Sequence, residues 1–171
     1  MKNPCSFAAS LLFSVCITTC VNAQTIPSKL NQIELMKQFV GSWKCEISKD
    51  TVEYEETISY GTGLEAYKKY FTKDKIIMEG KQLYGYDKKN DKFILSGLFI
   101  GMDIELCEIW FTSKNICIVY PYSDISKCER APFKVELEFK SSDNILYKVI
   151  VNNNIVQTFT LSRLKTNLNY F

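Results

Sequence analysis

The stretch PFKVELEFK, from Pro132 to Lys140, alternates apolar and charged side chains without interruption. Its apolar residues, which share one face of an extended chain, are Phe133, Val135, Leu137 and Phe139. A period of two residues is typical of a β-strand with one face against a core and the other in water. We therefore expect a strand here, in a sheet that buries one of its faces.

The same period-two pattern continues along most of the chain. Two hairpins are predicted where clusters of Asn and Asp separate alternating runs, one turning at 152–154 and the other at 87–91. Other strands are predicted at 43–48, 51–60, 64–72, 75–86, 92–100, 103–111 and 115–120.

About ten strands joined by short turns predict an all-β fold. An antiparallel up-and-down meander of about 8–10 strands closes into a barrel, because closure removes the exposed edges. A barrel of this size leaves room inside for one small ligand. A β-sandwich is the alternative that the same strand pattern allows.

One short helix is predicted ahead of the first strand. Asn31 can cap its N-terminus, and Glu34, three residues later, completes a capping box. Gly41 suits the C-terminal end, because glycine readily adopts the left-handed conformation. The apolar residues at helical spacing are Ile33, Leu35, Met36, Phe39 and Val40.

Gly41 and Trp43 open the first strand, and Arg163 lies in the last strand on the face shared with Phe159 and Leu161. If the barrel closes, these two strands become neighbours and Arg163 meets Trp43 at the end where the helix enters. A guanidinium over an indole contributes about 1–2 kcal/mol when desolvated. The other donors of the arginine could satisfy carbonyls at the helix C-terminus. From the residues alone, the pair could act as a structural clasp or contact a ligand.

This order of features resembles the calycin superfamily of lipocalins and fatty-acid-binding proteins. A closer likeness is to a bacterial lipocalin-like family of unknown function, whose members tend to read FVGxW, as at Phe39–Trp43, and GYDxxxxK(Y/F), as at Gly85–Phe93. They end in an arginine-bearing strand, as at Ser162–Arg163. The likeness covers most of 32–165 and implies a lipocalin-like barrel with the helix capping one end. It also implies that Gly41, Trp43 and Arg163 form a structural clasp at this closed end rather than a ligand contact. The chain departs from the family pattern after Phe93, so no ligand preference is carried over.

The first segment, Met1–Ala23, has the pattern of a secretory signal peptide, with Lys2 ahead of an apolar stretch and Val-Asn-Ala at the cleavage site. This predicts export to the periplasm or the extracellular space and one mature domain, 24–171. Cys20, preceded by Ile-Thr-Thr, is an alternative lipoprotein processing site. The apolar stretch is shorter than the roughly 20 residues that span a bilayer, and we expect no membrane span.

Composition narrows the classes of function. The chain has no histidine, which excludes a Ser-His-Asp triad, a Cys-His dyad and a His-ligated zinc or haem. A net charge of +2 without a long basic run gives no case for nucleic acid. Glu53, Glu55 and Glu56 cluster, but nothing specifies a glycosidase pair. We therefore expect a protein that is not an enzyme, with no cofactor and no metal site.

Four of the seven cysteines follow the predicted signal peptide: Cys45, Cys107, Cys117 and Cys128. An even number in an exported chain is compatible with disulfides. Cys107 and Cys117 lie on consecutive predicted strands, nearly opposite each other across a turn, so a cross-strand disulfide is plausible there. Cys45 and Cys128 would be the second pair. Three connectivities are open, and reduced, buried thiols are the alternative.

The apolar faces of the predicted strands supply the candidate ligand-binding residues. Their apolar members are Val52, Tyr54, Ile58, Met78, Tyr84, Phe133, Val135, Leu137 and Phe159. Glu56, Gln82 and Gln157 fall on the same faces and could orient a polar head group, with internal hydrogen bonding as the alternative. We therefore expect an exported, non-enzymatic protein that binds a small apolar or amphipathic molecule inside the barrel.

Two other functions fit the sequence. A barrel filled by its own side chains could act through its surface, binding a protein partner or inhibiting an enzyme, with 121–132 as the suspected loop. A hydrolase is the third, disfavoured by the missing histidine. The interior discriminates between them: a cavity favours the carrier, a packed interior the surface-acting module, and converging carboxylates in a cleft the hydrolase.

Overall fold

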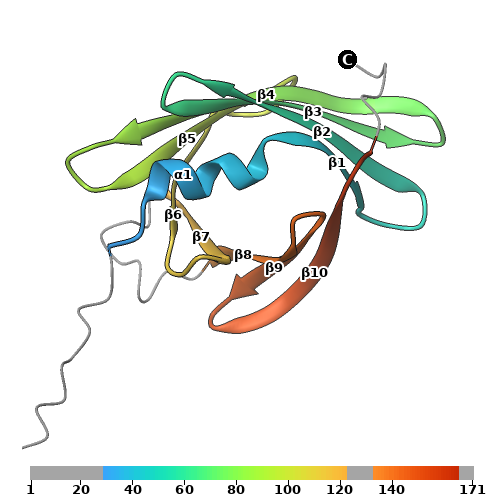
Figure 1. Cartoon of the computed structure of the whole chain (residues 1–171). Helices are drawn as coiled ribbons and strands as arrows, with labels where there is room; N and C mark the ends of the chain where they lie inside the picture. Colours follow the sequence, from blue (N-terminus) through green and yellow to red (C-terminus); the bar gives the residue numbers. More distant parts are fainter. Residues whose placement is uncertain (1–28, 123–132, 166–171) are drawn as a thin grey trace, which may run out of the picture.

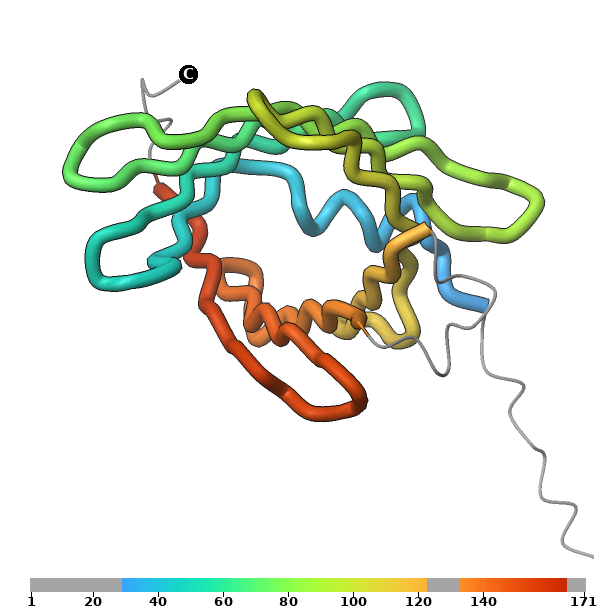
Figure 2. Tube along the Cα trace, turned by 180° about the vertical axis from the view of Figure 1, so that it is seen from behind, coloured from blue at the N-terminus to red at the C-terminus, as the bar shows by residue number. Residues whose placement is uncertain are grey.

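The computed structural model describes residues 29–122 and 133–165. They form a closed antiparallel barrel of ten strands with one short helix near the start, which confirms the predicted all-β barrel (Figure 1). The strands follow one another around the barrel in sequence order, and β1 closes it against β10. Figure 2 shows the trace returning from β10, in red, to β1 and β2. The predicted signal peptide with Cys20, the loop residues 123–132 and Cys128 lie outside the described residues.

The elements have the following bounds: α1 Gln32–Met36, a 3₁₀ turn Lys37–Phe39, β1 Gly41–Glu46, β2 Thr51–Tyr60, β3 Gly63–Thr72, β4 Lys75–Asp87, β5 Lys92–Phe99, β6 Glu105–Phe111, β7 Ile116–Pro121, β8 Phe133–Ser141, β9 Asn144–Val151 and β10 Asn154–Arg163. The hairpins predicted around 87–91 and 152–154 are the β4–β5 and β9–β10 hairpins, so both predictions are confirmed. In both turns the residues with positive φ are Asn or Asp, which tolerate this conformation: Asp91, Asn152 and Asn153.

The helix lies across one end of the barrel, as Figure 1 shows. The side chain of Asn31 accepts a hydrogen bond from the backbone nitrogen of Glu34 at 3.2 Å, so Asn31 is the N-cap that the sequence predicts. The buried side chain of Gln32 holds the helix on β6, because its amide exchanges hydrogen bonds of 2.9 and 2.7 Å with the backbone of Phe111. Met36 faces the core and is almost fully buried. The helix therefore closes this end of the barrel.

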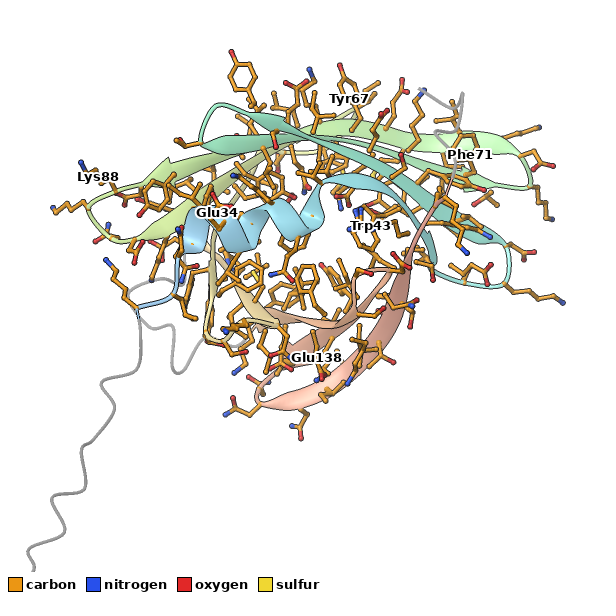
Figure 3. The ribbon with its side chains drawn as sticks, viewed as in Figure 1. Glu34, Trp43, Tyr67, Phe71, Lys88 and Glu138 are labelled. Atoms are coloured by element: carbon orange, nitrogen blue, oxygen red, sulfur yellow. The ribbon has the colours of Figure 1, made fainter. Side chains whose placement is uncertain are left out.

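The contact expected between the first and last strands is present. Trp43 and Arg163 are directly opposite in the β1–β10 pair, and the guanidinium carbon lies 4.0 Å from the centre of the indole ring. Nη1 and Nη2 donate to the carbonyls of Val40 and Gln38 at 2.6 and 3.0 Å. Gly41 has φ +130°, and a Cβ there would collide with Nη1 of the arginine. The arginine thus ties the end of the helix to the strand that closes the barrel. Figure 3 labels Trp43 where the helix leads into β1.

The core fills the half of the barrel next to the helix. Its most deeply buried large side chains are Trp43, Phe93, Phe111, Met36, Ile109 and Ile145. Phe39 joins them from the 3₁₀ turn, with its ring centre 5.0 Å from that of Phe139. This half of the interior is packed, so any room for a ligand lies farther from the helix.

Candidate functional site

The interior of the barrel holds a cavity of about 450 Å³. That volume falls within the range of small-molecule sites, about 300–1,000 Å³. It is lined by side chains from eight strands, from Ile47 just after β1 and from the β5–β6 loop. The lining residues are Cys45, Ile47, Glu53, Lys68, Tyr70, Met78, Gln82, Phe99, Met102, Asp103, Glu105, Tyr147, Val149, Phe159 and Leu161. The lining mixes apolar walls with charged and hydroxyl groups.

A buried ion cluster forms one part of the wall. Nζ of Lys68 lies 2.9 Å from Oε1 of Glu53 and 2.8 Å from Oε2 of Glu55. Thr57 donates to the other oxygen of Glu55 at 2.7 Å. Burial opposes the charge of Lys68, but the two carboxylates together outweigh it and raise the pKa of the lysine well above its ordinary value. The lysine therefore stays charged at neutral pH and holds both glutamates inside the barrel.

A second polar network lies on the β4 and β6 side of the cavity. Gln82 donates to Oε2 of Glu105 at 2.8 Å and accepts from the hydroxyl of Tyr84 at 2.9 Å. Burial, with Glu55 adding to it, raises the pKa of Tyr84 well above the ordinary value. Glu105 itself is exposed, at the end of the barrel opposite the helix. The network thus runs from the packed interior toward the open end.

Two tyrosine hydroxyls in the cavity wall have no hydrogen-bond partner within the described part of the chain: those of Tyr70 and Tyr147. Their rings pack on Phe99 and Phe159, with centres 6.4 and 6.0 Å apart. Burial raises the pKa of Tyr147 to about 12, and burial likewise raises that of Tyr70. Both groups are therefore neutral hydroxyls that a bound molecule could reach as donor or acceptor.

The predicted inner face of β2 is wrong. Tyr54, Glu56 and Ile58 lie on the outer face of the barrel, and Ile58 is 49% exposed. The inner positions belong to the polar residues of the strand, Glu53, Glu55 and Thr57, all of them buried. The expectation assumed that the more apolar face is the buried one. In β2 the polar face is buried instead, because Lys68 on the neighbouring strand pairs with both glutamates and compensates their charges. Val52 lies on the same outer face as Tyr54.

The other predicted lining residues divide into three groups. Met78, Gln82 and Phe159 line the cavity, and the partly buried Tyr84 lies beside it, with its hydroxyl bonded to Gln82. Val135 and Leu137 belong to the packed core rather than the cavity wall. Phe133 and Gln157 lie at the open end, where Phe133 is 40% exposed and Gln157 is exposed too.

The sequence interpretation missed most of the polar lining: Glu53, Lys68, Tyr70, Glu105 and Tyr147. One signal was available in LEAYKKYF, 64–71. Leu64 and Ala66 are small or apolar while Glu65 and Tyr67 lie outside, so the parity of the strand continues inward to Lys68 and Tyr70. Figure 3 shows Tyr67 on the outer side of the sheet. An inward lysine is then recognisable as the partner of inward carboxylates.

The predicted disulfide between Cys107 and Cys117 is not formed. In the β6–β7 pair, Cys107 is opposite Pro121, and Cys117 is opposite Phe111. The hairpin turns nearer to Cys117 than to Cys107, so the two thiols lie at different heights of the barrel. Cys45, Cys107 and Cys117 are all buried and free. The suggested partner of Cys45, Cys128, lies outside the described residues.

These three thiols are expected to resist alkylation in the native protein. Burial raises the pKa of Cys45 and Cys107 to about 12 and that of Cys117 well above its ordinary value, so little thiolate exists at pH 8. Peptide mapping after iodoacetamide treatment should find all three unmodified in the native protein. All three should be labelled after unfolding without reductant. The structure would be contradicted if Cys45 in the native protein were labelled as fast as in the unfolded protein, or if Cys45 stayed unlabelled after unfolding.

A larger hollow, of about 680 Å³, lies on the outside of the barrel over β2 to β5. Its apolar side chains are exposed, as with Ile58 and Leu98, and ion pairs such as Lys81–Glu65 flank it. It is a depression on one sheet face, whereas the interior cavity is enclosed by strands around the barrel. Within 29–122 and 133–165, no group of acidic or cysteine side chains is arranged to hold a metal ion, and no helix is long and apolar enough to cross a membrane.

No protein-family model matches the chain, and no curated protein matches it. The closed ten-stranded barrel with a short helix at one end is compatible with a calycin-like fold. The site must therefore be interpreted from its own geometry and chemistry.

Proposed function

We propose that the protein binds a small amphipathic molecule in the interior of its barrel and acts as an exported, non-enzymatic carrier. The observation that carries this proposal is the interior cavity of about 450 Å³, lined by apolar side chains and by Tyr70 and Tyr147, whose hydroxyls have no partner among the described residues. Apolar side chains would supply most of the affinity, at about 25 cal/mol per Å² buried before ordering costs. The hydroxyls and charges would orient a polar group.

The apolar part of the lining is large enough to hold a hydrocarbon or aromatic body. It comprises Ile47, Met78, Phe99, Met102, Val149, Phe159 and Leu161. These residues come from β4 and β5 on one side of the barrel wall and from β9 and β10 on the other, so a bound molecule would contact apolar groups on opposite sides. A ligand that is only apolar would remove water from the hydroxyls of Tyr70 and Tyr147 without giving them a hydrogen-bond partner, which is costly. This favours an amphipathic ligand.

Converging carboxylates are also the feature expected of a hydrolase. Glu53 and Glu55, however, both accept from the same lysine, and Glu55 accepts a further hydrogen bond from Thr57. Neither is left poised to take a proton from a substrate or to give one. The arrangement supports binding better than catalysis.

The resemblance of the FVGxW start and of the arginine-bearing last strand to lipocalin-like proteins supports the same proposal. The proposal also includes membership of the bacterial lipocalin-like family and export directed by the N-terminal segment Met1–Ala23. The helix closes one end of the barrel, which leaves the opposite end for ligand entry.

Native mass spectrometry of the protein purified gently from its host tests the proposal. We expect a mass excess that disappears when the protein is denatured in the same instrument. Val149→Trp, which fills the cavity, should abolish the excess. Ile155→Trp, at a 58% exposed position on the next strand, should retain it.

Circular dichroism would establish that both variants are folded. If Val149→Trp does not fold, Phe159→Trp takes its place as the variant that fills the cavity. A folded wild-type protein with no mass excess would overturn the proposal. The same excess in a folded cavity variant would place the ligand elsewhere and overturn it too.

A further inference from the structure

We infer that the ligand of this cavity is a cationic amphiphile, a molecule with a protonated amine on an apolar body. This inference rests on the proposed function and specifies the class of ligand. It comes from the balance of charge around the cavity, which the size and apolar walls alone do not determine.

Acidic groups outnumber basic groups at the cavity. Among the described residues that line it, Glu53, Asp103 and Glu105 are acidic and Lys68 is the one basic residue. Glu55, which pairs with Lys68 but is not itself among the lining residues, adds a fourth carboxylate. If each of the four carboxylates is counted as −1 and the lysine as +1, the site has a formal excess of three negative charges. The surrounding protein has low polarisability and screens them weakly. Such a site concentrates positive ions and repels negative ones.

The single lysine cannot serve an anionic ligand. Its ammonium group already lies within 2.9 Å of Glu53 and 2.8 Å of Glu55. A carboxylate or phosphate that approached Lys68 would add a third negative charge beside two buried ones. It would have to displace a glutamate into a space with no other cation among the lining residues. A fatty-acid type of head group is therefore disfavoured.

A protonated amine finds suitable partners in the same space. Within the part of the chain that the structure describes, Glu105 receives hydrogen bonds from two neutral groups, the amide of Gln82 at 2.8 Å and the thiol of Cys107 at 3.9 Å, and pairs with no cation. The hydroxyls of Tyr70 and Tyr147 can accept from an ammonium group, which has three donors and no acceptor. Their rings and that of Phe159 also offer faces for a cation.

A matched series of small probes tests this inference. Octylamine, octanol and octanoate share one apolar chain and differ in the charge of the head group. Isothermal titration calorimetry at neutral pH should show octylamine binding at least about tenfold tighter than octanoate, with octanol between them. The preference for the amine should shrink as salt is raised, because the exposed carboxylates at the open end are screened.

Two glutamate variants locate the effect. Glu105→Gln should weaken octylamine binding about three- to tenfold and leave octanol binding unchanged. Glu46→Gln removes one negative charge from an exposed side chain on β1 outside the cavity, and should change neither. Equal loss of amine binding in both variants would point to the overall charge of the protein instead of the cavity, and would overturn the inference.

The outcomes separate this inference from the proposed function. If octanoate binds as tightly as octylamine or tighter, or if octanol binds best, the cationic ligand is excluded while the carrier function stands. If the folded protein binds none of the three probes, both the inference and the carrier function are overturned.

Discussion

Lys68→Met is expected to lower the free energy of unfolding at neutral pH by about 3–5 kcal/mol, since it leaves two buried carboxylates without their cation. The side chains of Lys68, Glu53 and Glu55 are 14%, 10% and 6% exposed, so water can replace the lost partner only in part. Removing one member of a buried ion cluster costs far more than the cluster as a whole contributes, because the remaining charges stay buried.

Chemical denaturation followed by circular dichroism measures this loss. Lys140→Met is the matched control, since Lys140 pairs with Glu138 on the outer surface and its side chain is 52% exposed. We expect the control to change stability by less than about 1 kcal/mol. Adding Glu53→Gln and Glu55→Gln to Lys68→Met should recover much of the loss. A Lys68→Met protein as stable as the control would show that the cluster is not buried.

The pH dependence of this effect follows from the raised pKa of Lys68. A lysine whose pKa is raised on folding stabilises the protein fully below its ordinary pKa, about 10.4, and loses that contribution as the pH rises through the folded-state pKa. The difference in stability between wild type and Lys68→Met should therefore stay constant from about pH 7 to pH 9. It should narrow only at more alkaline pH.

Alternation and turn residues are sufficient to predict the barrel because both are local. A period of two residues identifies a strand whichever face is buried, and Asn and Asp mark the turns at 87–91 and 152–154. The closing contact of Trp43 with Arg163 follows once the strands are in order. The sequence therefore predicts the order of the strands and the end that the helix closes.

The inner face of β2 could not be derived from that strand alone. Its outer residue Ile58 is nearly half exposed, and its inner residues Glu53 and Glu55 depend on a lysine from β3. Hydropathy ranks the two faces of one strand, whereas burial here is decided by a partner on another. The cysteines show the same limit, since a shift of the β6–β7 turn by two residues moves Cys117 away from Cys107.

Arg163→Met should lower the free energy of unfolding by about 3 kcal/mol, the second large effect we expect. Methionine keeps an apolar chain over Trp43 but removes the charge above the indole. It also removes the donors to the carbonyls of Gln38, Val40 and Ser142, the last at 2.8 Å from Nε. A hydrogen bond to a charged group contributes about 1.5–3 kcal/mol, and these bonds are not additive.

Thermal and chemical denaturation measure this loss, and Arg163→Lys is the informative comparison. A lysine keeps the charge but cannot reach carbonyls on both sides of the strand at once, so it should recover less than half of the loss. Neither Arg163 nor Trp43 lines the cavity, so folded Arg163→Lys should bind octylamine with unchanged affinity. Weaker ligand binding at unchanged stability would make the arginine part of the binding site. Loss of stability at unchanged affinity would establish that it joins the helix to the closing strands, because only that role predicts a folding defect without a binding defect.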